Sequence, residues 1–187
     1  MDAITLTRQL IDIESITGNE AAVGNYLYGE LCRIGYQARK IPVETSRFNI
    51  YATLPEHPHP SVVFSTHMDT VPPFIPSSED AFKIYGRGAC DAKGIIAAQI
   101  AAAERLRQRG IYVGLLFVAG EERDSLGAKV ANDWAAKEFE AIPRLQKTQG
   151  WGTHSRGRVW RNRRAGHPAV GDPKLVTPKR VLLGRFP

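Results

Sequence analysis

The chain has 187 residues, of which 43% are hydrophobic and 24% are charged, a composition typical of a soluble globular protein. It contains no apolar run of 18 residues, which excludes a membrane-spanning helix, and residues 1–20 lack the basic and apolar regions of a secretory signal. The two cysteines, Cys32 and Cys90, are too few for a disulfide framework. We interpret them as buried or incidental thiols and expect a cytoplasmic protein.

The net charge of +6 is distributed very unevenly along the chain. Residues 144–187 hold 11 Lys and Arg residues and a single acid, Asp172. Residues 1–143 therefore hold 14 basic and 18 acidic residues, a net charge of −4. This distribution predicts a slightly acidic catalytic or binding domain over residues 1–140, followed by a basic tail over residues 141–187.

The first third of the sequence predicts two helices and then two strands. Apolar residues recur at helical spacing over residues 5–14 and again over residues 20–34, where Gly35 ends the pattern. Residues 36–43 and 48–54 alternate between apolar and polar side chains, as strands do, and are joined by the short turn "ETSR".

The next part alternates strands with helices. "SVVFST", residues 61–66, is a continuous apolar run typical of a strand buried on both faces of a parallel sheet. Residues 91–110 are rich in alanine and predict a helix, residues 111–120 predict a second buried strand, and residues 124–139 predict a last helix. The order indicates an α/β fold, a layered sheet with parallel buried strands and flanking helices, followed by an irregular tail.

Five side chains with metal-binding or proton-transfer chemistry follow these elements. His67 and Asp69 come just after one predicted buried strand, Glu121 and Glu122 just after the next, and Asp91 opens the alanine-rich helix. Ligands of open α/β sheets bind beyond the carboxyl ends of the strands, so we expect these groups to meet. Four carboxylates repel one another unless a cation neutralises them, and a histidine among carboxylates suits Zn²⁺, Co²⁺ or Mn²⁺ better than Ca²⁺ or Mg²⁺.

The local spacing indicates separate roles. On an extended strand end, residues i and i+2 point the same way, so the Asp69 carboxylate can hydrogen-bond the second ring nitrogen of His67. Adjacent Glu121 and Glu122 point in different directions, so one can bind a metal while the other takes a proton-transfer position.

Three stretches carry a resemblance to a known family. "STHMDTVPP", "GRGACDAKG" and "GEERDSLGA", in this order, resemble the catalytic-domain motifs of the M20 metallopeptidases, which include acetylornithine deacetylase, succinyl-diaminopimelate desuccinylase and aminoacylase. The resemblance implies a zinc-exopeptidase-like half-domain over residues 1–140. It implies two Zn²⁺ ions, or Co²⁺ or Mn²⁺, with His67 on one ion, Asp91 bridging both and Glu122 on the second. Glu121 would be the general base and Asp69 the partner that orients His67.

The implied reaction is hydrolysis of an amide bond in a small N-acyl amino acid or a short peptide by a metal-activated water. The sequence departs from the family pattern after Glu122. The expected further acidic ligand falls near residues 145–150, where there is no carboxylate, and the lid domain that usually forms the homodimer is not recognisable. His154 and His167 only faintly resemble the lid-domain histidine motif.

Two other interpretations remain open. The chain can be a catalytically inactive, truncated or frameshifted fragment that leaves the family pattern near residues 141–144. It can also bind nucleic acid through "RGRVWRNRR", in which arginines could contact phosphates and Trp160 could stack on bases, although no groove-reading fold surrounds this stretch.

Overall fold

The computed structural model describes residues 2–140. The predictions for residues 141–187, which include the basic tail, its origin, the nucleic-acid interpretation, and His154 and His167, fall outside the described residues. Within the described part, no helix is long and apolar enough to cross a membrane. Cys32 and Cys90 are exposed free thiols, so the expectation of buried thiols is wrong for both.

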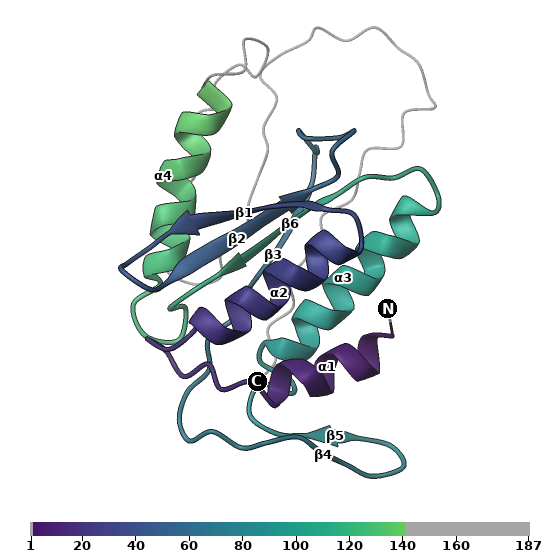
Figure 1. The fold of residues 1–187 in the computed structure, drawn as a ribbon, viewed down its shortest axis with the longest axis vertical. Helices are drawn as coiled ribbons and strands as arrows, with labels where there is room; N and C mark the ends of the chain where they lie inside the picture. Colours follow the sequence, from purple (N-terminus) through teal and green to yellow (C-terminus); the bar gives the residue numbers. More distant parts are fainter. Residues whose placement is uncertain (1, 141–187) are drawn as a thin grey trace, which may run out of the picture. The chain divides into compact units, whose positions relative to one another are not determined.

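A four-stranded mixed sheet forms the middle of the fold (Figure 1). Its strand order is β1-β2-β6-β3, where β1 is Gln37–Pro42, β2 is Phe48–Thr53, β6 is Gly114–Val118 and β3 is Val63–His67. β2 pairs antiparallel with both β1 and β6, whereas β3 pairs parallel with β6. A separate two-stranded hairpin is made of β4, Ser78–Glu79, and β5, Ile84–Tyr85.

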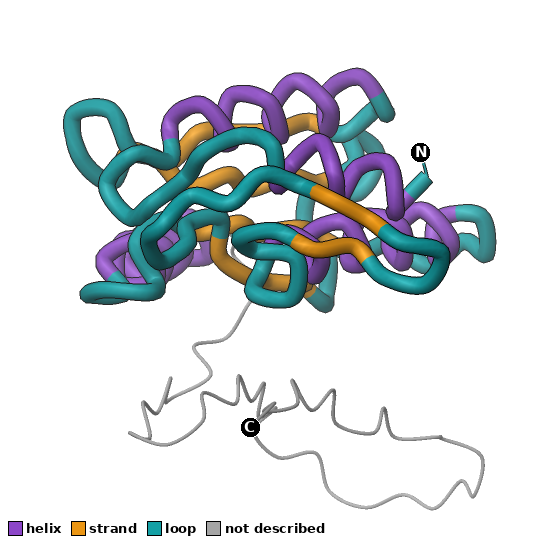
Figure 2. Tube along the Cα trace, turned by 90° about the horizontal axis from the view of Figure 1, so that it is seen from below, coloured by secondary structure: helices purple, strands orange, loops and turns teal. Residues whose placement is uncertain are grey.

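Helices cover both faces of the sheet, as Figure 2 shows from a second direction. Helices α2, Ala21–Arg33, and α3, Lys93–Arg107, pack on one face, and α1, Ala3–Ile11, packs on α3. On β2, Ile50 and Ala52 belong to the core on this face. Tyr51 alternates with them and meets Trp134 of α4, Leu126–Glu140, at 4.8 Å between ring centroids. The layered α/β fold with flanking helices is therefore confirmed.

The core between the sheet and the helices explains why these sequences fold as they do. The apolar residues that recur at helical spacing in α1, α2 and α3 are the ones that are buried there: Leu6, Leu10, Val23, Leu27, Leu31, Ile96 and Ile100. Leu115 and Phe117 of β6 are fully buried against them. Strand β6 is thus buried and paired on both sides, and the segment that contains the two glutamates follows its carboxyl end.

One expectation about the sheet is wrong. Strand β3 was predicted to be buried on both faces, yet it lies at the edge of the described sheet, with β6 as its only neighbour there. Val62 is 47% exposed and Val63 is 36% exposed. An apolar run indicates a strand but does not reveal how many strands flank it. β3 and β6 form the parallel pair expected from the strand–helix–strand order, whereas β1 and β2 pair antiparallel across the short turn expected between them.

Candidate metal centre

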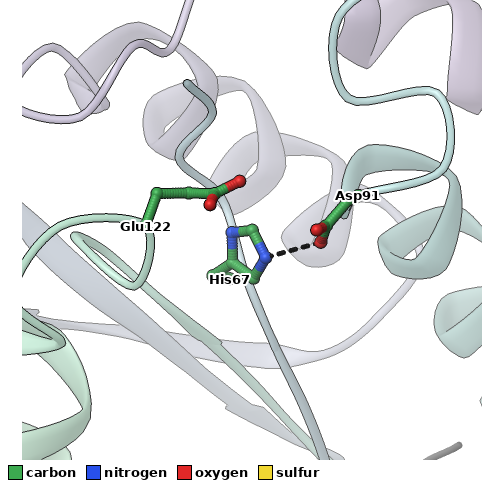
Figure 3. Close-up of side chains that lie close together, drawn as sticks. All are labelled: His67, Asp91 and Glu122. Carbon is green, nitrogen blue, oxygen red and sulfur yellow. Dashed lines mark hydrogen bonds and ion pairs between the residues drawn. The ribbon is translucent and has the colours of Figure 1, made fainter. Parts of the chain in front are cut away.

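Three of the predicted side chains converge at the carboxyl end of the β3–β6 pair. His67 is the last residue of β3, Glu122 lies in the loop after β6, and Asp91 lies two residues before α3. One potential ligand atom from each of the three lies within 4.8 Å of the others. Figure 3 shows Asp91 and Glu122 reaching toward the imidazole of His67 from two different segments. The convergence expected from strand order is therefore present.

The His67 ring lies between carboxylates at both nitrogens. Its Nε2 is 2.8 Å from Asp91 Oδ1, and its Nδ1 is 3.0 Å from the main-chain carbonyl of Asp69 and 3.4 Å from Asp69 Oδ1. Burial lowers the pKa of His67, but the carboxylates of Asp69 and Asp91 outweigh it and raise the pKa to about 9. Without a metal, the imidazole therefore carries a proton that a cation would displace.

Asp69 contacts more groups than His67, which is the one partner that the sequence predicted for it. Its carboxylate is fully buried and accepts hydrogen bonds from the main-chain N–H groups of Glu121, at 3.0 Å, and Glu122, at 3.1 Å, and from the Thr17 hydroxyl at 2.7 Å. Burial raises the pKa of Asp69, but these hydrogen bonds and the contact with His67 lower it to about 2. The carboxylate thus connects the end of β3 to the main chain of the two glutamates.

The two glutamates differ in environment. Glu122 belongs to the ligand cluster, and burial, together with nearby Asp91 and Glu121, raises its pKa against the opposing effect of His67. The Glu121 side chain is 49% exposed, and its Oε2 lies 3.9 Å from His67 Nε2. Glu121 therefore borders the cluster and remains accessible to solvent.

Asp91 is positioned by the turn before α3. Its side chain is 70% exposed. The turn contains Gly88, whose φ of +89° favours glycine and whose missing Cβ would lie 2.8 Å from Lys93 Cδ. Lys93 is 1% exposed and donates from Nζ to the Ile13 carbonyl at 2.5 Å. Burial lowers the pKa of Lys93 to about 8, although Asp12 and Glu14 act in the opposite direction.

Sequence reasoning missed the side chains that support this centre. Thr17 and Ser15, in the segment after α1, bind Asp69 and the main-chain carbonyl of Met68 respectively. Lys93 and Asn49 are buried and contact main-chain groups far along the chain. The sole signal for Lys93 and Asn49 was a polar residue inside an otherwise apolar helix or strand, and that signal does not identify a partner.

The donor set fits a divalent transition metal. One imidazole nitrogen and two carboxylate oxygens are the ligands that Zn²⁺ and its neighbours accept, and three protein ligands with an open position are typical of catalytic zinc. Among residues 2–140 these three form the one such group. The further acidic ligand that the family pattern places near residues 145–150 falls outside the described residues.

Comparison with known proteins gives the family. Residues 63–159 match the sequence model of peptidase family M20/M25/M40. A peptidase M20 domain-containing protein of Schizosaccharomyces pombe is 40% identical over 148 residues, which cover 73% of this chain and 37% of that protein. A probable carboxypeptidase of Emericella nidulans is 43% identical over 137 residues, which cover 67% of this chain and 32% of that protein. The chain thus spans about a third of the length of these curated relatives.

Solved structures agree at the level of the fold. A tripeptidase of Staphylococcus aureus superposes with a TM-score of 0.59 at 24% identity, over 71% of this chain and 39% of that chain. An M20 family metallo-carboxypeptidase of Sulfolobus solfataricus gives a TM-score of 0.57 at 18% identity, over 76% and 36% of the two chains. With three motifs in family order, the matching fold and the family match over residues 63–159, the chain belongs to peptidase family M20/M25/M40.

Proposed function

We propose that this chain provides the metal-binding part of a hydrolase that cleaves amide bonds in short peptides or small N-acyl amino acids. The observation that supports this most directly is the convergence of His67, Asp91 and Glu122, with the carboxylate of Glu121 beside them. A buried imidazole between carboxylates at the end of a strand is typical of a functional site, and it suits a metal-dependent hydrolase.

We assign the metal ligands as follows. His67, Asp91 and Glu122 would hold the metal, with Zn²⁺ as the first choice and Co²⁺ or Mn²⁺ as alternatives. A bound divalent ion would polarise the scissile carbonyl and make water a better nucleophile at neutral pH. The Asp91 side chain is 70% exposed, so its carboxylate is accessible to an ion from solvent.

The remaining residues handle protons and orientation. Glu121, half-exposed and 3.9 Å from His67, takes the proton from the attacking water and passes it to the leaving amine. Asp69 orients His67 through contacts at Nδ1, and it also fixes the main chain of both glutamates. A buried Asp69 with a pKa of about 2 stays ionised throughout the working pH range, which keeps this support constant.

The substrate class rests on the relatives. The names of the matched proteins, carboxypeptidase and tripeptidase, favour a short peptide, and a small N-acyl amino acid is the alternative from the same amide chemistry. We place the enzyme in the cytoplasm, with no membrane or nucleic-acid partner, and with a homodimer as the alternative to a monomer.

Hydrolysis by the full chain tests the proposal. The metal-loaded protein is assayed against N-acetyl amino acids and against di- and tripeptides, beside Glu121→Gln and a control at a carboxylate of α2 outside the cluster, Glu30→Gln. We expect Glu121→Gln to lose at least about a hundredfold in rate while it retains metal, and Glu30→Gln to match the parent. Metal binding without hydrolysis of any of these substrates would favour the inactive-fragment interpretation instead.

A further inference from the structure

The loop that carries the two glutamates, residues 119–127, is closed by a side chain from another strand. Asn49 of β2 is fully buried. Its Oδ1 accepts a hydrogen bond from the Ala119 N–H at 3.0 Å, and its Nδ2 donates to the Gly127 carbonyl at 2.8 Å. One amide therefore satisfies a main-chain donor at the start of the loop and a main-chain acceptor at its end.

The two ends of this loop pack directly against each other. The Gly127 N–H donates to the Ala119 carbonyl at 3.0 Å, so the two ends of the loop contact each other directly. A Cβ on Gly127 would lie 2.2 Å from that carbonyl oxygen and 2.6 Å from Asn49 Oδ1. The amide and the glycine thus fit together, and a side chain at residue 127 would not fit this closed form.

The closed loop meets a second support on the side of the metal cluster. The carboxylate of Asp69 binds the N–H groups of Glu121 and Glu122, which are the residues at the tip of the loop. Asn49 lies in β2 and Asp69 two residues after β3, and they hold different parts of the loop. A loop fixed at its base and at its tip leaves the glutamate main chain little freedom to move away from His67.

We propose that Asn49 is a positioning residue, which acts through the closed loop to hold Glu121 and Glu122 at the metal centre. Its two side-chain hydrogen bonds go to Gly127 and Ala119 and not to His67 or the carboxylates, and no motif of the sequence marks it. The part of the inference that concerns metal affinity rests on the proposed function, whereas the part that concerns the loop does not.

Amide hydrogen exchange measured by NMR on the full chain tests the loop directly. In Asn49→Ala, we expect the Glu121 and Glu122 amides to exchange at least about tenfold faster relative to the amides of α2, although their own acceptor, Asp69, is untouched. The matched control is Arg107→Ala, which removes another side-chain bond to a main-chain carbonyl, that of Ile34 at 3.0 Å. In the control, the ratio of loop to α2 exchange should stay within about twofold of the parent.

A measurement on the parent protein covers the case in which Asn49→Ala does not fold. The Ala119, Glu121 and Glu122 amides should then show one common dependence of exchange on denaturant, as a single cooperative unit does. Independent opening of Glu121 and Glu122, or an unchanged exchange ratio in Asn49→Ala, would overturn the inference.

A Co²⁺ titration separates this inference from the proposed function. Asn49→Ala should weaken Co²⁺ binding about tenfold and change its visible absorption spectrum, while Arg107→Ala should change neither. If the parent binds no Co²⁺, the proposed metal chemistry fails, and the exchange data still decide the role of Asn49. Unchanged Co²⁺ affinity in a variant with a loosened loop would refute the positioning of the glutamates.

Discussion

The two carboxylate segments that meet His67 are held in opposite ways. The glutamate loop, residues 119–127, is fixed by side chains far away in the sequence, with Asn49 at its base and Asp69 at its tip. The Asp91 turn is fixed by its own neighbours, because the main-chain N–H groups of Lys93 and Gly94 both donate to the Gly88 carbonyl. The side-chain bonds of the loop span 52 to 78 residues of sequence, whereas the two main-chain bonds of the turn span at most six, with one longer bond added by Lys93 to the Ile13 carbonyl.

This difference predicts which substitutions will displace each segment. Substitutions far along the chain should displace the glutamates, whereas only substitutions within the turn itself should displace Asp91. The side chains agree with this division, since Asn49 and Asp69 are fully buried while Asp91 is 70% exposed. Four substitutions or conditions test the contrast, and they are taken from the largest expected effect on stability to the smallest.

Removal of the Asp69 carboxylate should have the largest effect. Asp69→Ala leaves the Glu121 and Glu122 N–H groups and the Thr17 hydroxyl without their acceptor. We expect a loss of about 3–5 kcal/mol in the free energy of unfolding, measured by denaturant titration. Asp69→Asn keeps one acceptor oxygen and should lose less. Equal stability of Asp69→Ala and the parent would show that the loop does not depend on this carboxylate.

The pH dependence of the metal-free protein should report His67. Its pKa is raised from 6.5 to about 9 in the folded state, so its protonation stabilises the fold fully below pH 6.5. That stability is lost as pH rises toward 9, by about 3 kcal/mol. Denaturant titrations with a chelator present measure the loss, and His67→Gln should remove this part of the pH dependence. A parent curve that is flat between pH 6 and 9 would contradict the assignment.

Gly88→Ala should disturb the Asp91 turn alone. The φ of +89° is unfavourable for alanine, and the new Cβ would crowd Lys93 and lie 3.1 Å from Thr70 Cγ2. We expect a loss of about 2 kcal/mol, with exchange protection of the Glu121 and Glu122 amides unchanged. Gly110→Ala is the control, because Gly110 has a φ of +72° but no atom within 4 Å of the added Cβ. Loss of glutamate protection in Gly88→Ala would contradict the contrast.

Lys93→Met should have the smallest effect. The substitution removes the hydrogen bond to the Ile13 carbonyl, and it also removes the unfavourable burial of an ammonium group whose pKa burial lowers to about 8. These effects oppose each other, so we expect a change within about 1 kcal/mol in either direction. A loss of about 3 kcal/mol in thermal or denaturant unfolding would instead make this lysine a principal support of the turn.

Much of the fold and of the site follows from local sequence patterns. Helical spacing predicted the helices, and the position of His67 and Glu122 after two strand ends predicted that they meet, because parallel strands share a carboxyl edge. Asn49 could not be found in this way, since its two partners lie 70 and 78 residues away. The edge position of β3 was missed for a similar reason, because the sequence of an apolar strand does not show how many strands pair with it.

The central claim is that His67, Asp91 and Glu122 together hold a divalent metal ion. Zn²⁺ titration calorimetry on the full chain, with His67→Gln, Glu122→Gln and the α2 control Glu30→Gln, measures this directly. We expect saturable binding by the parent and by Glu30→Gln, with affinity reduced about a hundredfold or more in the other two variants. No binding by the parent, or affinity that is the same in all four proteins, would contradict the account.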